Sequence, residues 1–192
     1  MTKKKGEQEA KSPKRKGRNK VVRLPVKIFL VGFMGSGKSH WGRIWADKAG
    51  IPFFDLDTKI EKAFRMTIAR IFEKKGEEKF RELERYHLRK FEKKKNFLLA
   101  CGGGAPCFFD NMKWMKNEGM VFYLKASPER IVQQLINETE HRPVIKNVKP
   151  SDLLSFIQHK LVEREPYYFQ ADHILNVNEL DENSLSSFIS PS

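Results

Sequence analysis

The sequence predicts an α/β fold in which five parallel strands form a sheet with helices on both faces. Short apolar segments alternate with longer segments of helical periodicity, and the short ones lack the apolar–polar alternation of a sheet with one wet face. Glycine-rich or acidic residues follow three of the short segments, which is where ligands bind in such sheets. At 192 residues with 40% hydrophobic content, the chain is long enough for one domain of this class.

The expected elements follow in order along the chain. Five strands are predicted at residues 26–31, 52–55, 97–101, 120–124 and 173–177. Helical patterns occupy residues 38–49, 57–64, 67–74, 77–94, 108–117, 128–138 and 151–164. Ser127 and Pro128 supply an N-cap and a first-turn proline for one helix, and Ser151 and Asp152 follow Pro150 at the start of another. Because helices separate the strands, we expect the strands to be parallel.

A phosphate-binding loop follows the first predicted strand. Residues 32–39 read Gly-Phe-Met-Gly-Ser-Gly-Lys-Ser and fit the pattern G-x-x-x-x-G-K-[ST]. The glycines let successive backbone N–H groups turn toward a β-phosphate, Lys38 can reach the β- and γ-oxygens, and the Ser39 hydroxyl can ligate Mg²⁺. The helix expected from Lys38 presents its positive end to the same anion. We therefore predict that the chain binds a nucleoside triphosphate.

Polar residues and glycines also follow the second and third predicted strands. Asp55 and Asp57 flank Leu56, so in an extended segment both carboxylates point the same way. There they could hold the water shell of a metal or accept a proton from an attacking hydroxyl. In the simpler interpretation, Asp57 only caps the helix that follows it. Residues 102–104 are three consecutive glycines, which could let a small ligand approach the backbone closely.

Three arginines are further candidates for anion binding. Each of Arg81, Arg142 and Arg164, taken alone, is an ordinary surface residue in a basic chain. Arg142 lies in residues 137–150, a polar stretch interrupted by prolines that suits a mobile lid. A closing lid can deliver a guanidinium to a migrating phosphoryl group.

The positive charge is concentrated at the start of the chain. The formal net charge is +13, and nine Lys or Arg against two Glu give residues 1–20 a charge of +7. We expect residues 1–22 to form a disordered basic arm and residues 23–192 to form the folded domain. The arm is either a solvated tail or a weak attachment to nucleic acid or an anionic surface. It is Lys-rich rather than Arg- and Ser-rich, which disfavours a transit peptide.

Several classes of protein are disfavoured by composition. No apolar run approaches the roughly 20 residues that span a bilayer, and no signal-peptide pattern is visible. Cys101 and Cys107 are too few for a disulfide framework and lack metal-ligand spacing. We expect a monomeric cytoplasmic protein with no membrane partner.

Six groups of residues, in order, resemble the shikimate kinase family of P-loop kinases. They are residues 32–39; Phe54-Asp55-Leu56-Asp57 with Ile60-Glu61; Ile71-Phe72, Gly76-Glu77, Phe80-Arg81 and Glu84; Gly102-Gly103-Gly104-Ala105; Arg142-Pro143; and Arg164-Glu165-Pro166-Tyr167-Tyr168. The resemblance runs from about Lys27 to Val177. It implies a nucleoside monophosphate kinase fold with a lid, and transfer of the ATP γ-phosphoryl group to the 3-hydroxyl of shikimate. ATP is then the co-substrate and Mg²⁺ the cofactor.

The resemblance also implies a role for each candidate residue. The residues that would bind the nucleotide are Gly35, Ser36, Gly37, Lys38, Ser39, His40 and Arg142, with Ser39 and Asp55 serving Mg²⁺. The residues that would bind shikimate are Asp57 at the hydroxyls, Arg81 and Arg164 at the carboxylate, and Gly103 and Gly104 beside the ring. The catalytic residues would be Lys38, Asp57, which would also act as the base, and Arg142. Guanidinium groups and a carboxylate suit a carboxylated polyol.

The chain departs from the family pattern near the nucleotide. His40 stands where the family usually has Thr, Gln134 stands near the place of an arginine that packs on adenine, and the segment before Arg142 is one residue longer. The basic arm is extra to the family core. Two alternatives stay open: another small-molecule kinase of this fold, such as a gluconate-type kinase, and a nucleic-acid-binding regulator that uses the arm.

Overall fold

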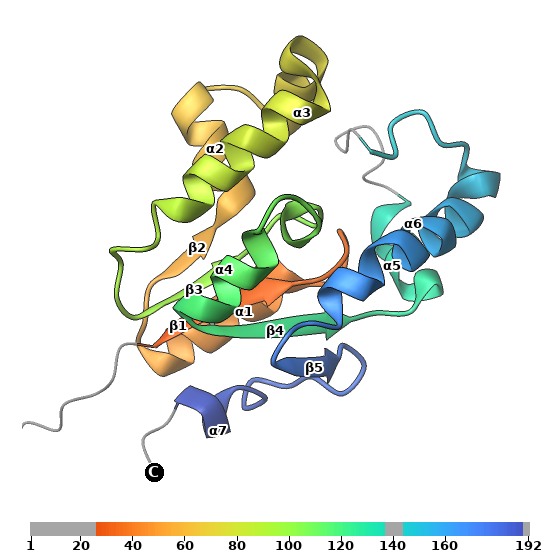
Figure 1. The fold of residues 1–192 in the computed structure, drawn as a ribbon. Coiled ribbons are helices and arrows are strands. Elements are labelled where there is room, and N and C mark those ends of the chain that lie inside the picture. Colours follow the sequence, from red (N-terminus) through yellow and green to blue (C-terminus); the bar gives the residue numbers. More distant parts are fainter. Residues whose placement is uncertain (1–25, 137–143, 190–192) are drawn as a thin grey trace, which may run out of the picture.

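The fold is built around one sheet (Figure 1). The computed structural model describes residues 26–136 and 144–189. Within these residues, five parallel strands pair in the order β2-β3-β1-β4-β5. They are β1 (Lys27–Val31), β2 (Phe53–Asp55), β3 (Phe97–Ala100), β4 (Met120–Lys125) and β5 (His173–Asn176). The predicted fold class, an α/β fold with a five-stranded parallel sheet, is confirmed.

The central strand β1 shows why the strands lack alternation. Residues 28–31 read Ile-Phe-Leu-Val, and all four side chains are fully buried. Successive side chains of a strand point to opposite faces, so both faces of the sheet must be covered. The neighbouring strand β3 is buried along its whole length in the same way.

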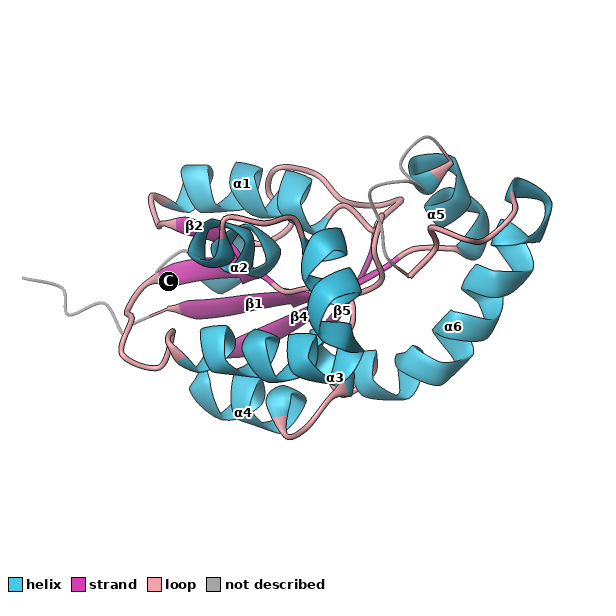
Figure 2. Cartoon of the chain, turned by 90° about the horizontal axis from the view of Figure 1, so that it is seen from above, coloured by secondary structure: helices cyan, strands magenta, loops and turns pink. Residues whose placement is uncertain are grey.

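Helices cover the two faces of the sheet (Figure 2). The helix α1 (Lys38–Ala49) lies on one side, and α3 (Ile68–Arg89) and α4 (Asn111–Glu118) lie on the other. The remaining helical elements are α2 (Leu56–Phe64), η1 (Ala105–Cys107), α5 (Pro128–Leu135), η3 (Pro150–Asp152), α6 (Leu153–Tyr168) and α7 (Ser186–Ile189). In the part of the chain that the structure describes, none of these helices is both long and apolar enough to cross a membrane.

The helix α3 is bent at a glycine. Gly76 has φ 75° and ψ 169°, a region of backbone space that is essentially restricted to glycine. The helices predicted over 67–74 and 77–94 correspond to the two halves of α3. The predicted end at residue 94 is wrong, because the helix ends at Arg89 and the chain turns through Asn96, which has a left-handed backbone (φ 51°), into β3.

Other helix boundaries also differ from the prediction. A helix is predicted over 108–117, but α4 begins at Asn111 because the short turn η1 and a left-handed Phe109 (φ 54°) precede it. The helix predicted over 151–164 extends to Tyr168, since Pro166 lies in its last turn and frees only one backbone carbonyl there. The short helix α7 is not predicted at all.

Several predicted features lie outside the described residues. These are the arm at residues 1–22 and residues 137–143 of the predicted lid, with Arg142 among them. The predicted end of the 128–138 helix is wrong, because α5 ends at Leu135 with Ile136 as its C-cap. The rest of the lid stretch, from Val144, is described.

Candidate active site

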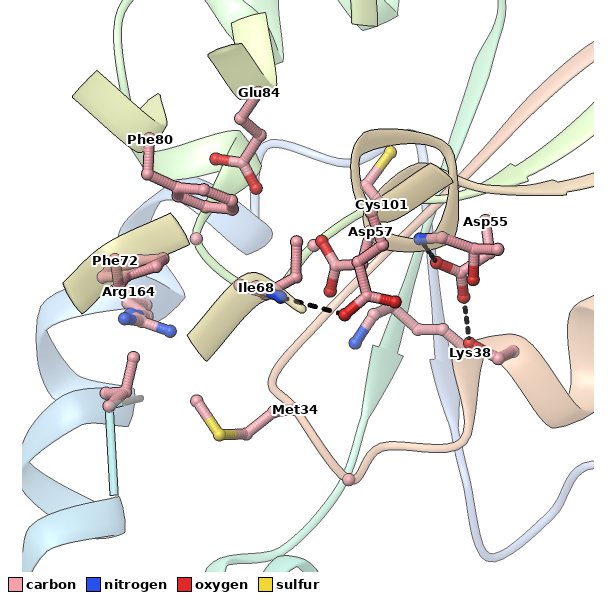
Figure 3. Close-up of a pocket in the computed structure, with 18 of the residues that line it drawn as sticks. Met34, Lys38, Asp55, Asp57, Ile68, Phe72, Phe80, Glu84, Cys101 and Arg164 are labelled. Carbon is pink, nitrogen blue, oxygen red and sulfur yellow. Dashed lines mark hydrogen bonds between the residues drawn. The ribbon is translucent and has the colours of Figure 1, made fainter. Parts of the chain in front are cut away.

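A pocket of about 520 Å³ lies at the carboxyl edge of the sheet (Figure 3). It is bounded by the phosphate-binding loop, α2, α3, the triglycine segment 102–104 and α6. All predicted site residues line it except Ser36, which is buried within the loop, and Arg142, which lies outside the described residues. Residues from five separate segments therefore meet in one cavity, as the parallel topology requires.

The phosphate-binding loop takes the form that the sequence predicts. Gly37 has a left-handed backbone (φ 86°) and stands immediately before α1, so the helix begins at Lys38 with its N-terminal N–H groups facing the loop. The Lys38 side chain is only 8% exposed, and its Nζ donates to the carbonyls of Gly32 at 2.9 Å and Phe33 at 2.7 Å. The ammonium thus lies over the loop, where a bound phosphate would be neutralised.

His40 lies at the outer side of this loop. It is exposed, lines the pocket and packs edge-on against the Trp41 ring, with ring centroids 5.2 Å apart. Trp41 in turn stacks on Trp45, with centroids 5.6 Å apart. Gln134 from α5 lines the same pocket. Both residues that depart from the family pattern therefore border the site.

Asp55 connects the second strand to the loop. The Ser39 hydroxyl donates to Asp55 Oδ2 at 2.6 Å, and Asp55 Oδ1 accepts from the backbone N–H of Thr58 at 3.1 Å, which makes Asp55 the N-cap of α2. A hydroxyl and a carboxylate oxygen beside a phosphate-binding loop are the donors that Mg²⁺ prefers. The described residues contain no cluster of three or more His, Cys, Asp or Glu side chains suited to a metal.

The structure contradicts two expectations about the backbone at Asp57, namely that the segment is extended and that Asp57 caps the following helix. The segment is not extended, because α2 begins at Leu56 and places Asp57 in its first turn. The helix is capped by Asp55 rather than by Asp57. In the first turn a carboxylate is favoured by the helix dipole, and Asp57 lines the pocket from there.

Two arginines enter the pocket from different helices. Arg81 on α3 is 4% exposed, and its guanidinium donates to Glu84 Oε2 at 2.9 Å and to Glu77 Oε1 at 2.8 Å. It also lies over the ring of Phe108, 4.3 Å from the centroid. Arg164 on α6 is 8% exposed, and Figure 3 shows it directed into the cavity. Both arginines are therefore buried pocket residues, unlike the exposed arginines that are common in a basic chain.

The triglycine is required by the side chains around it. A Cβ on Gly102 would lie 2.5 Å from Glu84 Oε1 and 2.8 Å from Asp57 Oδ1, and one on Gly104 would overlap the Arg81 guanidinium. The carbonyl of Gly103 accepts a hydrogen bond from the Tyr168 hydroxyl at 2.5 Å. Site side chains thus pack directly against this backbone, in addition to any ligand that approaches it.

Glu84 is the site residue that the sequence left without a role. It is 1% exposed, and burial and the nearby Asp57 charge together raise its pKa to about 7 against the opposing effect of Arg81. Glu84 stands three residues after Arg81 on the same helix face, a spacing that favours an ion pair. The sequence could therefore have indicated that Glu84 pairs with Arg81 at the site.

The two cysteines are free thiols, as predicted. Cys101 is fully buried and its pKa is strongly raised by that burial. Burial also raises the pKa of Cys107 to about 11. Neither thiol is ionised near neutral pH, so neither is suited to nucleophilic chemistry.

Comparison with known proteins places this pocket in a family. The shikimate kinase family model matches residues 34–190. A shikimate kinase from Bacteroides thetaiotaomicron is 40% identical over 157 residues, which cover 82% of this chain and 90% of the relative.

Solved structures agree. A crystal structure of the shikimate kinase from Bacteroides thetaiotaomicron has a TM-score of 0.77 and 39% identity, covering 85% of this chain and 94% of that one. Shikimate kinase from Acinetobacter baumannii, in complex with shikimate, has a TM-score of 0.78 and 34% identity, covering 86% of this chain and 90% of that one. From the length of these matches and the pocket that they include, the chain belongs to the shikimate kinase family of ATP-dependent kinases.

Proposed function

We propose that the protein transfers the γ-phosphoryl group of ATP to the 3-hydroxyl of shikimate. The observation that carries the proposal is the meeting of Arg81, Arg164 and Asp57 in one pocket beside the phosphate-binding loop. Two guanidinium groups suit a carboxylate, and a carboxylate suits ring hydroxyls. The shikimate complex of the Acinetobacter baumannii relative supports the same assignment.

Asp57 is the proposed base. Shikimate held by its carboxylate between Arg81 and Arg164 has its ring beside the backbone of Gly103 and Gly104 and its hydroxyls toward Asp57. The Asp57 carboxylate accepts the proton of the 3-hydroxyl as that oxygen bonds to the γ-phosphorus, while the bond from the γ-phosphorus to the β,γ-bridging oxygen breaks and ADP leaves. Met34, Phe72 and Phe80 line the pocket with apolar groups, which would help to displace water that competes as the acceptor once the substrates are bound.

The nucleotide half of the pocket supplies positive charge. Lys38 and the N-terminal N–H groups of α1 would stabilise the phosphate oxygens as the phosphoryl group moves. Ser39 and Asp55 would hold Mg²⁺, directly or through water, and His40 would contact the nucleotide beside them. When bound, the ion would neutralise charge on the β- and γ-phosphates. Arg142 remains the predicted lid arginine.

An ADP-release assay tests this function against its alternatives. Shikimate, gluconate and nucleoside monophosphates are each offered with Mg²⁺ and ATP, and K38M serves as the inactive control. Of the three kinds of acceptor, we expect only shikimate to be turned over. The K38M variant should lose several orders of magnitude in turnover, because the missing ammonium acts on the transferring phosphoryl group. Preference for gluconate or a nucleotide would refute the proposed substrate while keeping the kinase.

The remaining expectations belong to the same proposal. We expect the enzyme to work in the cytoplasm as a monomer, with the basic arm outside the catalytic unit. A nucleic-acid-binding assay at several salt concentrations tests the regulator alternative. Salt-dependent binding by the full chain that disappears when residues 1–22 are deleted would support it.

A further inference from the structure

Glu84 is a buried carboxylate with one oxygen unused. Its Oε2 accepts the hydrogen bond from Arg81, whereas Oε1 is buried and has no hydrogen-bond partner among the described residues. Leaving such an oxygen charged and unpaired in a buried position is unfavourable, because the water that would solvate it is absent. A proton on Oε1 removes that cost and turns the oxygen into a donor.

The unused oxygen faces a second carboxylate. Glu84 Oε1 and Asp57 Oδ1 approach the same point, the position that a side chain on Gly102 would occupy. Figure 3 shows both carboxylates on the pocket wall. Two negative charges that approach the same point repel each other, and Glu84 is the buried one of the pair, so a neutral Glu84 is favoured.

Burial and Asp57 raise the pKa of Glu84, and Arg81 and Arg164 lower it, which leaves it at about 7. A change of one charge nearby is therefore enough to alter its protonation at neutral pH. The charged and titratable groups around this space come from every packed element: Glu77 and Arg81 on α3, Asp57 and Glu61 on α2, Arg164 on α6, Lys38 on α1, Cys101 after β3 and Cys107 in η1.

We propose that Glu84 is a positioning residue that takes up a proton when shikimate binds, so that shikimate affinity falls as the pH rises above neutrality. The inference rests on the proposed function, because it needs the substrate carboxylate at Arg81. That carboxylate adds a negative charge beside Glu84 and competes with it for the guanidinium. Protonation of Glu84 removes the repulsion and frees the charge of Arg81 for the substrate.

Calorimetry measures this coupling directly. Shikimate is titrated into the full chain at pH 7.5 in buffers of different ionisation enthalpy, which counts the protons taken up. We expect about 0.5–1 proton per shikimate, and a dissociation constant that rises roughly tenfold between pH 7 and pH 8.5.

Two variants separate titration from packing. E84Q keeps the shape and can accept from Arg81, but it mimics the neutral form at every pH, so it should bind shikimate without proton uptake and with little pH dependence. E77Q removes the other carboxylate at Arg81, one whose side chain is 55% exposed. E77Q should therefore retain the proton uptake of the parent. Thermal unfolding and ATP binding at pH 7 show whether each variant is folded.

The outcomes are distinct. Shikimate binding without proton uptake in the parent, or equal uptake in the parent and E84Q, overturns the role of Glu84 and leaves the proposed function standing. No shikimate binding at any pH overturns the proposed function and this inference together. Uptake that is lost in E84Q and kept in E77Q supports both.

Discussion

Arg81 and Arg164 serve the same proposed ligand but differ in what surrounds them. Arg81 is ion-paired on both sides, with Glu84 and Glu77. Among the described residues no ion pair involves Arg164, whose guanidinium lies 5.3 Å from the centroid of the Phe33 ring. Removal of Arg81 therefore leaves the buried Glu84 carboxylate without its counter-ion, whereas removal of Arg164 does not.

This difference predicts separable effects of two substitutions. R164A should weaken shikimate binding roughly tenfold to hundredfold through the lost charge-assisted hydrogen bond, with stability nearly unchanged. R81A should weaken binding at least as much and also destabilise the fold by about 3 kcal/mol at pH 8, because Glu84 is left buried and unpaired. Urea unfolding and shikimate titration check both. Equal losses of stability in the two variants would contradict the prediction. The R164K variant tests whether binding needs the planar guanidinium of Arg164 or only its positive charge.

The kink in α3 sets the direction of its second half. Gly76 separates the first turns of α3, which reach the pocket through Phe72, from the second half, which reaches it through Phe80, Arg81 and Glu84. A Cβ at Gly76 would touch nothing within 4 Å, so only backbone conformation requires glycine there. The site geometry on α3 thus depends on one residue with a dihedral pair that other residues avoid.

Substitution of this glycine should cost stability without any clash. G76A is expected to lower the free energy of unfolding by about 1–3 kcal/mol. G50A is the matched control, since Gly50 also has open space around it but an ordinary left-handed backbone (φ 64°, ψ 32°) that alanine adopts more readily. Denaturant unfolding measures both. A cost for G76A no larger than that for G50A would show that the bend relaxes when alanine is introduced.

At the scale of the whole molecule, the sheet and its ligand edge could be predicted from apolar runs and from the residues that follow them. The contacts across the pocket could not. Gly102 and Gly104 have no room for a side chain, because Glu84, Asp57 and Arg81 fill the space. This crowding depends on how α2 and α3 pack against the triglycine segment, and local sequence does not encode that packing. The start of α2 at Leu56 was missed because Asp55 serves both as the end of β2 and as the cap.

Glu84 should leave a signature in the pH dependence of global stability. Its pKa is about 7 in the folded protein against an ordinary value of 4.5, so between these values the folded state binds the extra proton. Its contribution is therefore full below about pH 4.5 and is lost as the pH rises toward 7. The free energy of unfolding of the parent minus that of E84Q should fall by roughly 3 kcal/mol between pH 4.5 and 8.

Taking the difference cancels other titrations. His87, for example, has a pKa lowered by burial and by Lys90, and it is present in both proteins. Urea unfolding across this pH range provides the measurement. A constant difference would mean that Glu84 stays in one protonation state throughout.

The basic arm should be separable from catalysis. Deletion of residues 1–22 removes +7 of the net charge of +13 and none of the pocket residues. We expect unchanged turnover at ordinary ionic strength and at most a modest change in substrate association at low salt. ADP release measured over a range of salt concentrations checks this, and a large loss of turnover at all of them would show that the arm contributes to the site.

The stacked indoles beside the phosphate-binding loop give the protein an internal optical reporter. The chain has three tryptophans. In α1, Trp41 packs against His40 and stacks on Trp45, while Trp114 lies in α4, packed on Phe29. A nucleotide that reaches His40 changes the surroundings of the first pair and leaves Trp114 untouched. Intrinsic fluorescence should therefore follow ATP rather than shikimate, with the signal lost in W41F and kept in W114F. Occupancy of the two substrates could then be followed separately without any attached dye.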